Sequence, residues 1–228
     1  MSLGLTIRPG LLIDRWESLR RLDVPTIALV IANATPLFGV LFLHWQVFPL
    51  LLLYWFENVI VGLINVPRML MAGPYDVLGW MFKITGAFFF CAHFSAFTLG
   101  HALCLFQVFG KYKIEGLFDV VPNILPAIQK AGLGFAALSL TFSHVVSFVT
   151  NYVRGGEYRR ATQEQLFFQP YRRVFIMHAT LLVGGLLTWA FGSPVLGLLV
   201  LVGIKTGVDL HAHRAERRRL GASPTLKP

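Results

Sequence analysis

The chain has 228 residues, of which 55% are hydrophobic and only 14% charged, with a mean hydropathy of +0.64. Soluble domains carry about 25% charged residues, so this composition excludes an ordinary soluble domain and indicates a membrane protein. The formal net charge of +9 does not indicate nucleic-acid binding, because the basic residues lie at the edges of apolar segments, as the positive-inside rule describes.

The N-terminal segment, 1–23, has no continuous apolar core and no small-residue cleavage site, so we do not expect a signal peptide there. Its apolar residues, such as Trp16 and Leu19, alternate with Arg15 and Arg20. This pattern is typical of a short helix that lies in the headgroup region of a membrane. We therefore expect an amphipathic interfacial helix before the first membrane span.

Six segments are apolar and long enough to cross a bilayer, which takes about 20 residues per helix. They are 24–43, 48–70, 80–109, 131–153, 172–191 and 194–213. The third is longer than a crossing requires, and we expect it to tilt or to project beyond the membrane. The expected fold class is thus an all-α membrane protein, with a six-helix transmembrane bundle over 24–213 and a basic cytoplasmic tail over 214–228.

The 20 lysines and arginines fall unevenly on the two sides of such a bundle. Lys111, Lys113 and Lys130 lie on one side, Lys205 lies inside a span, and the other sixteen lie on the opposite side. Lysine and arginine accumulate in cytoplasmic loops, so the distribution predicts that both termini are cytoplasmic. We expect the location to be the inner membrane of a bacterium.

Ionisable side chains recur inside the predicted spans. When the six spans are placed across the membrane in alternating directions, His101 falls in the outer half. The other ionisable groups fall between the midplane and the cytoplasmic face: Glu57, His93, His144, His178, Asp209 and His213. Because hydrocarbon cannot solvate such groups, they turn toward the bundle interior and pair with one another. We therefore expect five helices to form one shared polar site.

The last predicted span carries a polar stripe. Lys205, Asp209 and His213 are spaced at i, i+4 and i+8, and each such step turns about 40° around a helix, so they share one face. Lys205 and Glu57 both fall near mid-depth. A salt bridge between them, with a structural role, is therefore one alternative for these two residues.

Five short elements carry a resemblance to a known group of proteins: "YWFEN", "HFSAFTLGHALCLF", "SHVVSFVTNY", "PYRRVFIMH" and "KTGVDLHAH". Together they resemble a bacterial and archaeal family of multipass membrane proteins known as a domain of unknown function. The resemblance extends from about residue 25 to 215. The chain departs from it after His93, where Phe94 and Ser95 replace a tyrosine-glycine pair. The resemblance implies a shared fold and polar site, and it implies no activity.

Repeated imidazoles and carboxylates at one depth are a ligand set suited to zinc, which takes neutral histidines and acidic oxygens. We expect His93, His178 and His213 to bind the metal, with His144 as a reserve ligand. Asp209 would be a further ligand or would orient a histidine. The chain has no His-Glu-x-x-His motif, so this prediction depends on the constellation alone.

A zinc-bound water becomes hydroxide near neutral pH. Glu57 or Asp209 would act as the base, and Lys205 would stabilise the negative charge that develops. The resulting hypothesis is a metal-dependent hydrolase acting on an amide or ester of a membrane lipid.

Three other functions stay open at this point. His93, together with His144 or His178, would serve as axial ligands of haem b in an electron-transfer protein. The chain of carboxylates and histidines would also suit a proton or ion relay. Finally, the polar residues would simply hold together an accessory subunit. The expected partners are membrane lipids, a lipid substrate, and a second copy or a larger membrane complex, with no nucleic acid.

Overall fold

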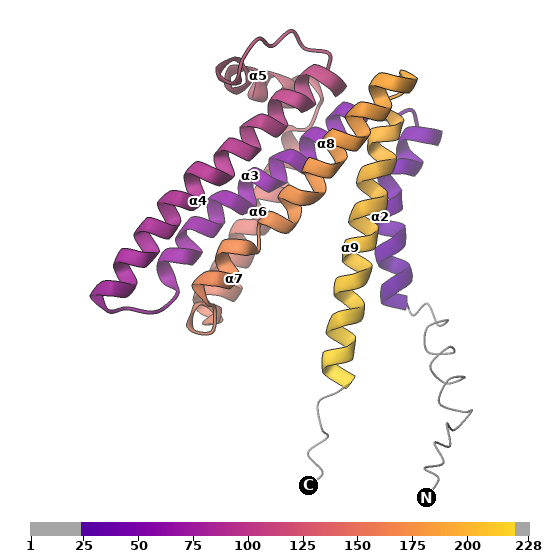
Figure 1. Ribbon diagram of the computed structural model, residues 1–228. Helices are drawn as coiled ribbons and strands as arrows, with labels where there is room; N and C mark the ends of the chain where they lie inside the picture. The colour runs from indigo at the N-terminus through magenta and orange to yellow at the C-terminus, as the bar shows by residue number, and fades with distance from the viewer. Residues whose placement is uncertain (1–23, 222–228) are drawn as a thin grey trace, which may run out of the picture. The chain divides into compact units, whose positions relative to one another are not determined.

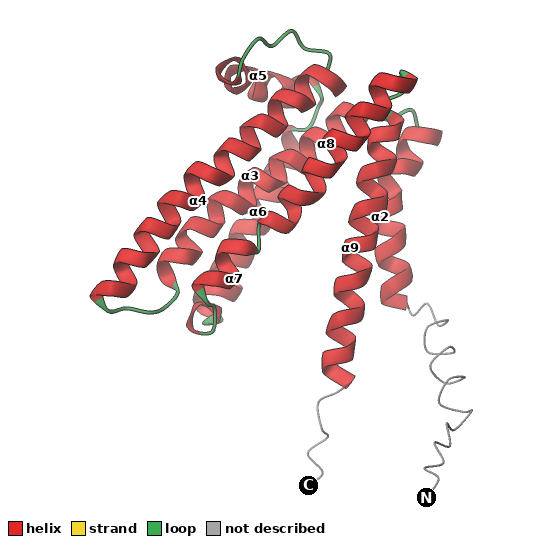
Figure 2. Cartoon of the chain, in the orientation of Figure 1, coloured by secondary structure: helices red, strands yellow, loops and turns green. Residues whose placement is uncertain are grey.

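The computed structural model describes residues 24–221, with side chains described for 30–31 and 33–212. This part of the chain is helical and contains no strand (Figure 2). The chain divides into a larger unit, Pro36–Ile204, and a smaller unit made of Met1–Thr35 and Lys205–Pro228. The expected interfacial segment, 1–23, and the end of the basic tail, 222–228, lie outside the described residues.

Four long helices form the larger unit, and α3 is the central one, because it packs against α4, α6 and α8 (Figure 1). Two of them continue as π-helical turns at their carboxyl ends. The bounds are α3 Val47–Met71, α4 Val77–Cys104 with the turn Leu105–Phe109, α6 Gly134–Ser147 with the turn Phe148–Arg154, and α8 Tyr171–Phe191.

Two short helices lie at opposite ends of these four. Helix α5, Leu117–Lys130, lies where α4 ends, and α7, Gln163–Phe168, precedes α8 at the other end (Figure 1). The remaining helices, α2 at Val24–Phe42 and α9 at Val195–Gly221, each begin in one unit and end in the other. The tight turn between α8 and α9 contains Gly192 at φ 70°, a backbone angle that favours glycine.

Five segments are long and apolar enough to cross a membrane: Val47–Met71, Val77–Phe109, Gly134–Arg154, Gln163–Phe191 and Val195–Ala212. Large apolar side chains on them, such as Phe88, Phe135 and Trp189, are exposed, as expected for surfaces that face lipid. The chain is therefore a multipass membrane protein.

The first predicted span, 24–43, corresponds to the 19-residue helix α2. Its part Asn33–Phe42 is a shorter apolar helix. The structure thus has five helices that could span a membrane and a shorter N-terminal one, and the sixth crossing stays a prediction.

The turn between α3 and α4 is fixed by polar groups at two helix ends. Asp76 caps the start of α4, where its carboxylate accepts a hydrogen bond from the Gly79 backbone N–H at 3.2 Å. Lys83 reaches back to the end of α3, where its Nζ donates to the carbonyl oxygens of Ala72 at 2.9 Å and Leu70 at 3.4 Å. The sequence analysis counted Lys83 only among the sixteen cations of the cytoplasmic side, but it is only 1% exposed and caps a helix.

Helix α7 docks against the end of α3 through both apolar and polar contacts. Leu166 is buried in an apolar cluster with Met69, Phe90, Phe94, Tyr152 and Val174. Fully burying one such side chain contributes roughly 1.5–3 kcal/mol. The Asn65 amide also donates to the Leu166 carbonyl at 2.8 Å. The apolar segment that corresponds to the fifth predicted span thus begins at Gln163 in the structure rather than at the predicted residue 172.

Candidate functional site

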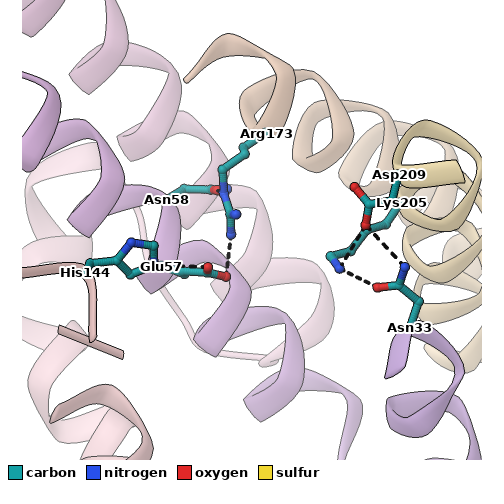
Figure 3. A network of polar contacts seen from close by, with 7 residues as sticks. All are labelled: Asn33, Glu57, Asn58, His144, Arg173, Lys205 and Asp209. Atoms are coloured by element: carbon teal, nitrogen blue, oxygen red, sulfur yellow. Dashed lines mark hydrogen bonds and ion pairs between the residues drawn. The ribbon is translucent and has the colours of Figure 1, made fainter. Parts of the chain in front are cut away.

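Glu57 is the eleventh residue of the 25-residue helix α3. Its carboxylate forms an ion pair with the Arg173 guanidinium of α8, and its Oε1 lies 3.2 Å from Nε2 of His144 on α6 (Figure 3). The side chains are partly buried, with exposed fractions of 22% for Glu57, 25% for Arg173 and 31% for His144. We call these three residues the Glu57 triad, and through it one carboxylate joins three helices.

Arg173 is held by more than its ion pair. Its Nε donates to Oδ1 of Asn58 at 2.8 Å, and Asn58 is buried (Figure 3). The guanidinium also lies 5.2 Å from the centre of the Tyr54 ring, within range of a cation–π interaction. A planar guanidinium can contact several fixed partners at once, and for Arg173 these partners, Tyr54, Glu57 and Asn58, all lie on α3.

An ionised side chain at the centre of a membrane helix costs roughly 2.5–3.5 kcal/mol on insertion scales. The guanidinium of Arg173 offsets that cost for Glu57, because each charge neutralises the other in a region of low dielectric constant. The sequence analysis counted Arg173, at the start of the predicted span 172–191, among the sixteen cations of the cytoplasmic side, and so missed the cation of this site.

A cavity of about 600 Å³ lies beside the triad. Arg173 and His144 contribute to its wall, whereas Glu57 is not one of the described lining residues. The other lining residues are Val61, Ile64, Arg68, Phe168, Gln169, Pro170 and Arg172. Two members of the triad are thus in contact with a space that small molecules could enter.

A second polar group lies in the smaller unit. Lys205 Nζ is 3.3 Å from Oδ2 of Asp209, one turn further along α9 (Figure 3). Asn33 of α2 accepts a hydrogen bond from Lys205 and donates one to Asp209 at 3.2 Å. We call these residues the Lys205 group. The shared face predicted for Lys205 and Asp209 is confirmed, while the side chain of His213 lies outside the described residues.

Three other histidines have partners of their own. Nδ1 of His93 is 2.7 Å from the hydroxyl of Tyr171. Nε2 of His101 is 3.1 Å from Nδ1 of His178, with the two ring centres 5.4 Å apart. The sequence separated His101 from the other histidines, but it is the partner of His178.

The predicted site residues therefore fall into separate groups. The triad contains Glu57 and His144, and the Lys205 group contains Lys205 and Asp209. Glu57 pairs with Arg173 within the larger unit, and Lys205 pairs with Asp209 within the smaller one. The alternative Glu57–Lys205 salt bridge stays a prediction. The residues that the sequence analysis missed are Arg173 and Asn33. The only signal for Arg173 was an arginine pair placed next to an apolar run.

The proposed metal ligands were His93, His144, His178, Asp209 and His213. Among the side chains that the structure describes, no three histidines, cysteines or acidic residues are grouped so as to hold a metal ion. Each of the four described ligands has a different hydrogen-bonding or ionic partner. Zinc, and haem b likewise, stay predictions from the sequence.

A protein family of unknown function (DUF6498) matches residues 15–225, which include the triad and the Lys205 group. The resemblance to an uncharacterised family is thereby confirmed. No curated protein and no solved structure matches the chain.

Proposed function

Since the chain belongs to this family of unknown function, we propose its role from its polar site: it relays protons through the Glu57 triad in the inner membrane of a bacterium. Helix α2 would be the sixth crossing, and both termini would be cytoplasmic, as the distribution of lysine and arginine favours. The observation that carries the proposal is the 3.2 Å contact between Glu57 and a histidine that lines a cavity.

His144 would be the entry point of the relay. Its imidazole lines the cavity, so it can exchange a proton with water there, and imidazole is the side chain best suited to gain and lose protons near neutral pH. A proton on Nε2 lies between this nitrogen and Oε1 of Glu57. Chains of histidine and carboxylate inside membrane segments are a recurring feature of proton pathways.

Arg173 would hold Glu57 in place between transfers. Its two other contacts, with Asn58 and the Tyr54 ring, do not depend on the charge of the carboxylate. The guanidinium can therefore stay in position while the protonation state of Glu57 changes. That arrangement would let the site cycle without rearranging the packing of α3 and α8.

The experiment is proton flux into liposomes that contain the full chain and a pH-sensitive dye, driven by a potassium diffusion potential. We expect Glu57→Gln and His144→Gln to lower the flux to the rate of protein-free liposomes. Glu115→Gln is the matched control, because Glu115 is an exposed carboxylate in the loop before α5. A wild-type chain that conducts no faster than protein-free liposomes would overturn the proposal.

Zinc-dependent hydrolysis of a lipid amide or ester needs three protein ligands around one ion. We prefer the relay because the described histidines and carboxylates are engaged in separate pairs. Elemental analysis of the purified chain distinguishes the two. One zinc per chain, lost in His178→Ala and retained in His211→Ala, would favour the hydrolase instead.

A further inference from the structure

We propose that the cavity beside the Glu57 triad binds the phosphate group of an anionic membrane lipid. This inference goes beyond the proton relay and does not depend on it. It concerns the wall of the cavity formed by Arg68 and Arg172, two residues to which the relay assigns no role.

The charge of the wall favours an anion. Arg68, Arg172 and Arg173 all line the cavity together with His144, and no aspartate or glutamate is among the described lining residues. The described partners of Arg68 are neutral: its Nη1 donates to Oε1 of Gln169 at 3.1 Å, and its guanidinium lies 4.7 Å from the centre of the Tyr152 ring. The positive charge of Arg68 is therefore available to an anion in the cavity.

The kind of cation favours phosphate. Guanidinium groups present several N–H donors in one plane, and this geometry matches two oxygens of a phosphate at once. Arg68 and Arg172 come from different helices, α3 and α8, so they can hold one phosphate from two sides. A volume of about 600 Å³ is ample for a headgroup, since small-ligand sites span roughly 300–1,000 Å³.

The position of the cavity favours a lipid over a soluble phosphate. Arg68 lies in the last turn of α3, at the end of an apolar segment long enough to span a membrane, a position that would be near the lipid headgroups. Val61, Ile64 and Phe168 line the same cavity and provide apolar surface for the start of an acyl chain. Basic pockets between membrane helices are known places for anionic headgroups, especially on the cytoplasmic side.

The test is native mass spectrometry of the full chain, freed of lipid in a neutral detergent. It is titrated separately with phosphatidylglycerol, phosphatidylcholine and inorganic phosphate. We expect phosphatidylglycerol to bind most tightly, and Arg68→Gln combined with Arg172→Gln to weaken it about tenfold or more, as expected for losing charge-assisted hydrogen bonds. Arg159→Gln is the matched control, because Arg159 is an exposed arginine that does not line the cavity.

Each other outcome would count against the proposal in a distinct way. Equal weakening by Arg159→Gln would mean that diffuse surface charge attracts the lipid. Binding of inorganic phosphate without preference for phosphatidylglycerol would mean that the ligand is a soluble phosphate. If the double variant does not fold, Arg68→Lys replaces it, and unchanged affinity in a folded Arg68→Lys variant would overturn guanidinium recognition. An affinity for phosphatidylglycerol no greater than for phosphatidylcholine would overturn the lipid site.

Discussion

Glu57 on α3 and Asp209 on α9 are both carboxylates in apolar helices, yet their cationic partners come from different places. Asp209 contacts Lys205, which lies one turn earlier on the same helix, at 3.3 Å. Glu57 contacts Arg173 of α8 and His144 of α6, both of them distant in the sequence. The exposed fractions of the two carboxylates are similar, 20% for Asp209 and 22% for Glu57, so the source of the partner is the main difference.

The Lys205–Asp209 pair stabilises a single helix, whereas the Glu57 triad stabilises the packing of three helices. The Lys205–Asp209 pair at i and i+4 forms whenever its helix forms, and hydrogen bonds with the neutral amide of Asn33 connect it to α2. An ion pair between helices forms only when those helices have packed, so it favours one arrangement of the bundle over others. We expect mutations in the Glu57 triad to be more damaging than equivalent mutations in the Lys205 group.

The largest effect is expected for Arg173→Gln, which leaves the Glu57 carboxylate without its guanidinium. Removing one partner of a buried pair costs about 3–5 kcal/mol, and we expect about 3 kcal/mol here because both side chains are about a quarter exposed. The measurement is the free energy of unfolding of the full chain in mixtures of SDS and a mild detergent.

The double variant Arg173→Gln with Glu57→Gln supplies the control for that interpretation. It removes the uncompensated charge, so it should regain part of the stability that Arg173→Gln loses. A double variant as unstable as Arg173→Gln alone would show that the guanidinium acts through packing, and the contrast with the Lys205 group would lose its electrostatic basis.

An intermediate effect is expected for His144→Ala. It removes a hydrogen bond to a charged group, which contributes roughly 1.5–3 kcal/mol, and the lower figure applies because Arg173 still neutralises Glu57. His144→Gln retains a donor and should be close to wild type in the same unfolding measurement. A loss of equal size in both variants would mean that the imidazole ring, rather than its hydrogen bond, stabilises the bundle.

The smallest effect is expected for Lys205→Met. Exposed helical i, i+4 pairs contribute about 0.3–0.5 kcal/mol, but Asp209 is about as buried as Glu57. Lys205→Met also removes the hydrogen bond to Asn33. The Asn33 amide still donates to Asp209 when the lysine is gone. We expect a loss of about 1 kcal/mol by the same method, because Asn33 remains as a hydrogen-bond donor to Asp209. A loss as large as that of Arg173→Gln would remove the distinction between the two groups.

The sequence was sufficient to predict much of the fold, because the length of an apolar segment indicates whether it can form a membrane helix. It also identified Glu57 and His144 as site residues, since ionisable groups in apolar runs are conspicuous. It missed Arg173 because this residue is the second of the predicted span 172–191 and was counted with the cations of the cytoplasmic side, not with the polar groups inside the bundle. In the structure the apolar helical segment begins at Gln163, and the buried Leu166 packs its first turn against the end of α3.

The same boundary explains the error in the histidine depths. In a span of 172–191, His178 falls near the cytoplasmic end, but in Gln163–Phe191 it is the sixteenth of 29 residues, close to the middle. His178 can therefore reach His101, which the sequence analysis had placed in the outer half. The depth of a residue in the membrane, when it is predicted from the sequence, is only as accurate as the predicted ends of its helix. A short helix such as α7 has no long apolar run from which those ends could be predicted.

The capping role of Lys83 gives the chain an internal reporter. Its amine, 1% exposed and bonded to the carbonyl oxygens of Leu70 and Ala72, is shielded from acylating reagents, whereas Lys111 and Lys113 are exposed. Brief treatment of the folded chain with an N-hydroxysuccinimide ester should therefore modify the exposed lysines and spare position 83. The rate at which position 83 becomes labelled would then measure how often the turn between α3 and α4 opens.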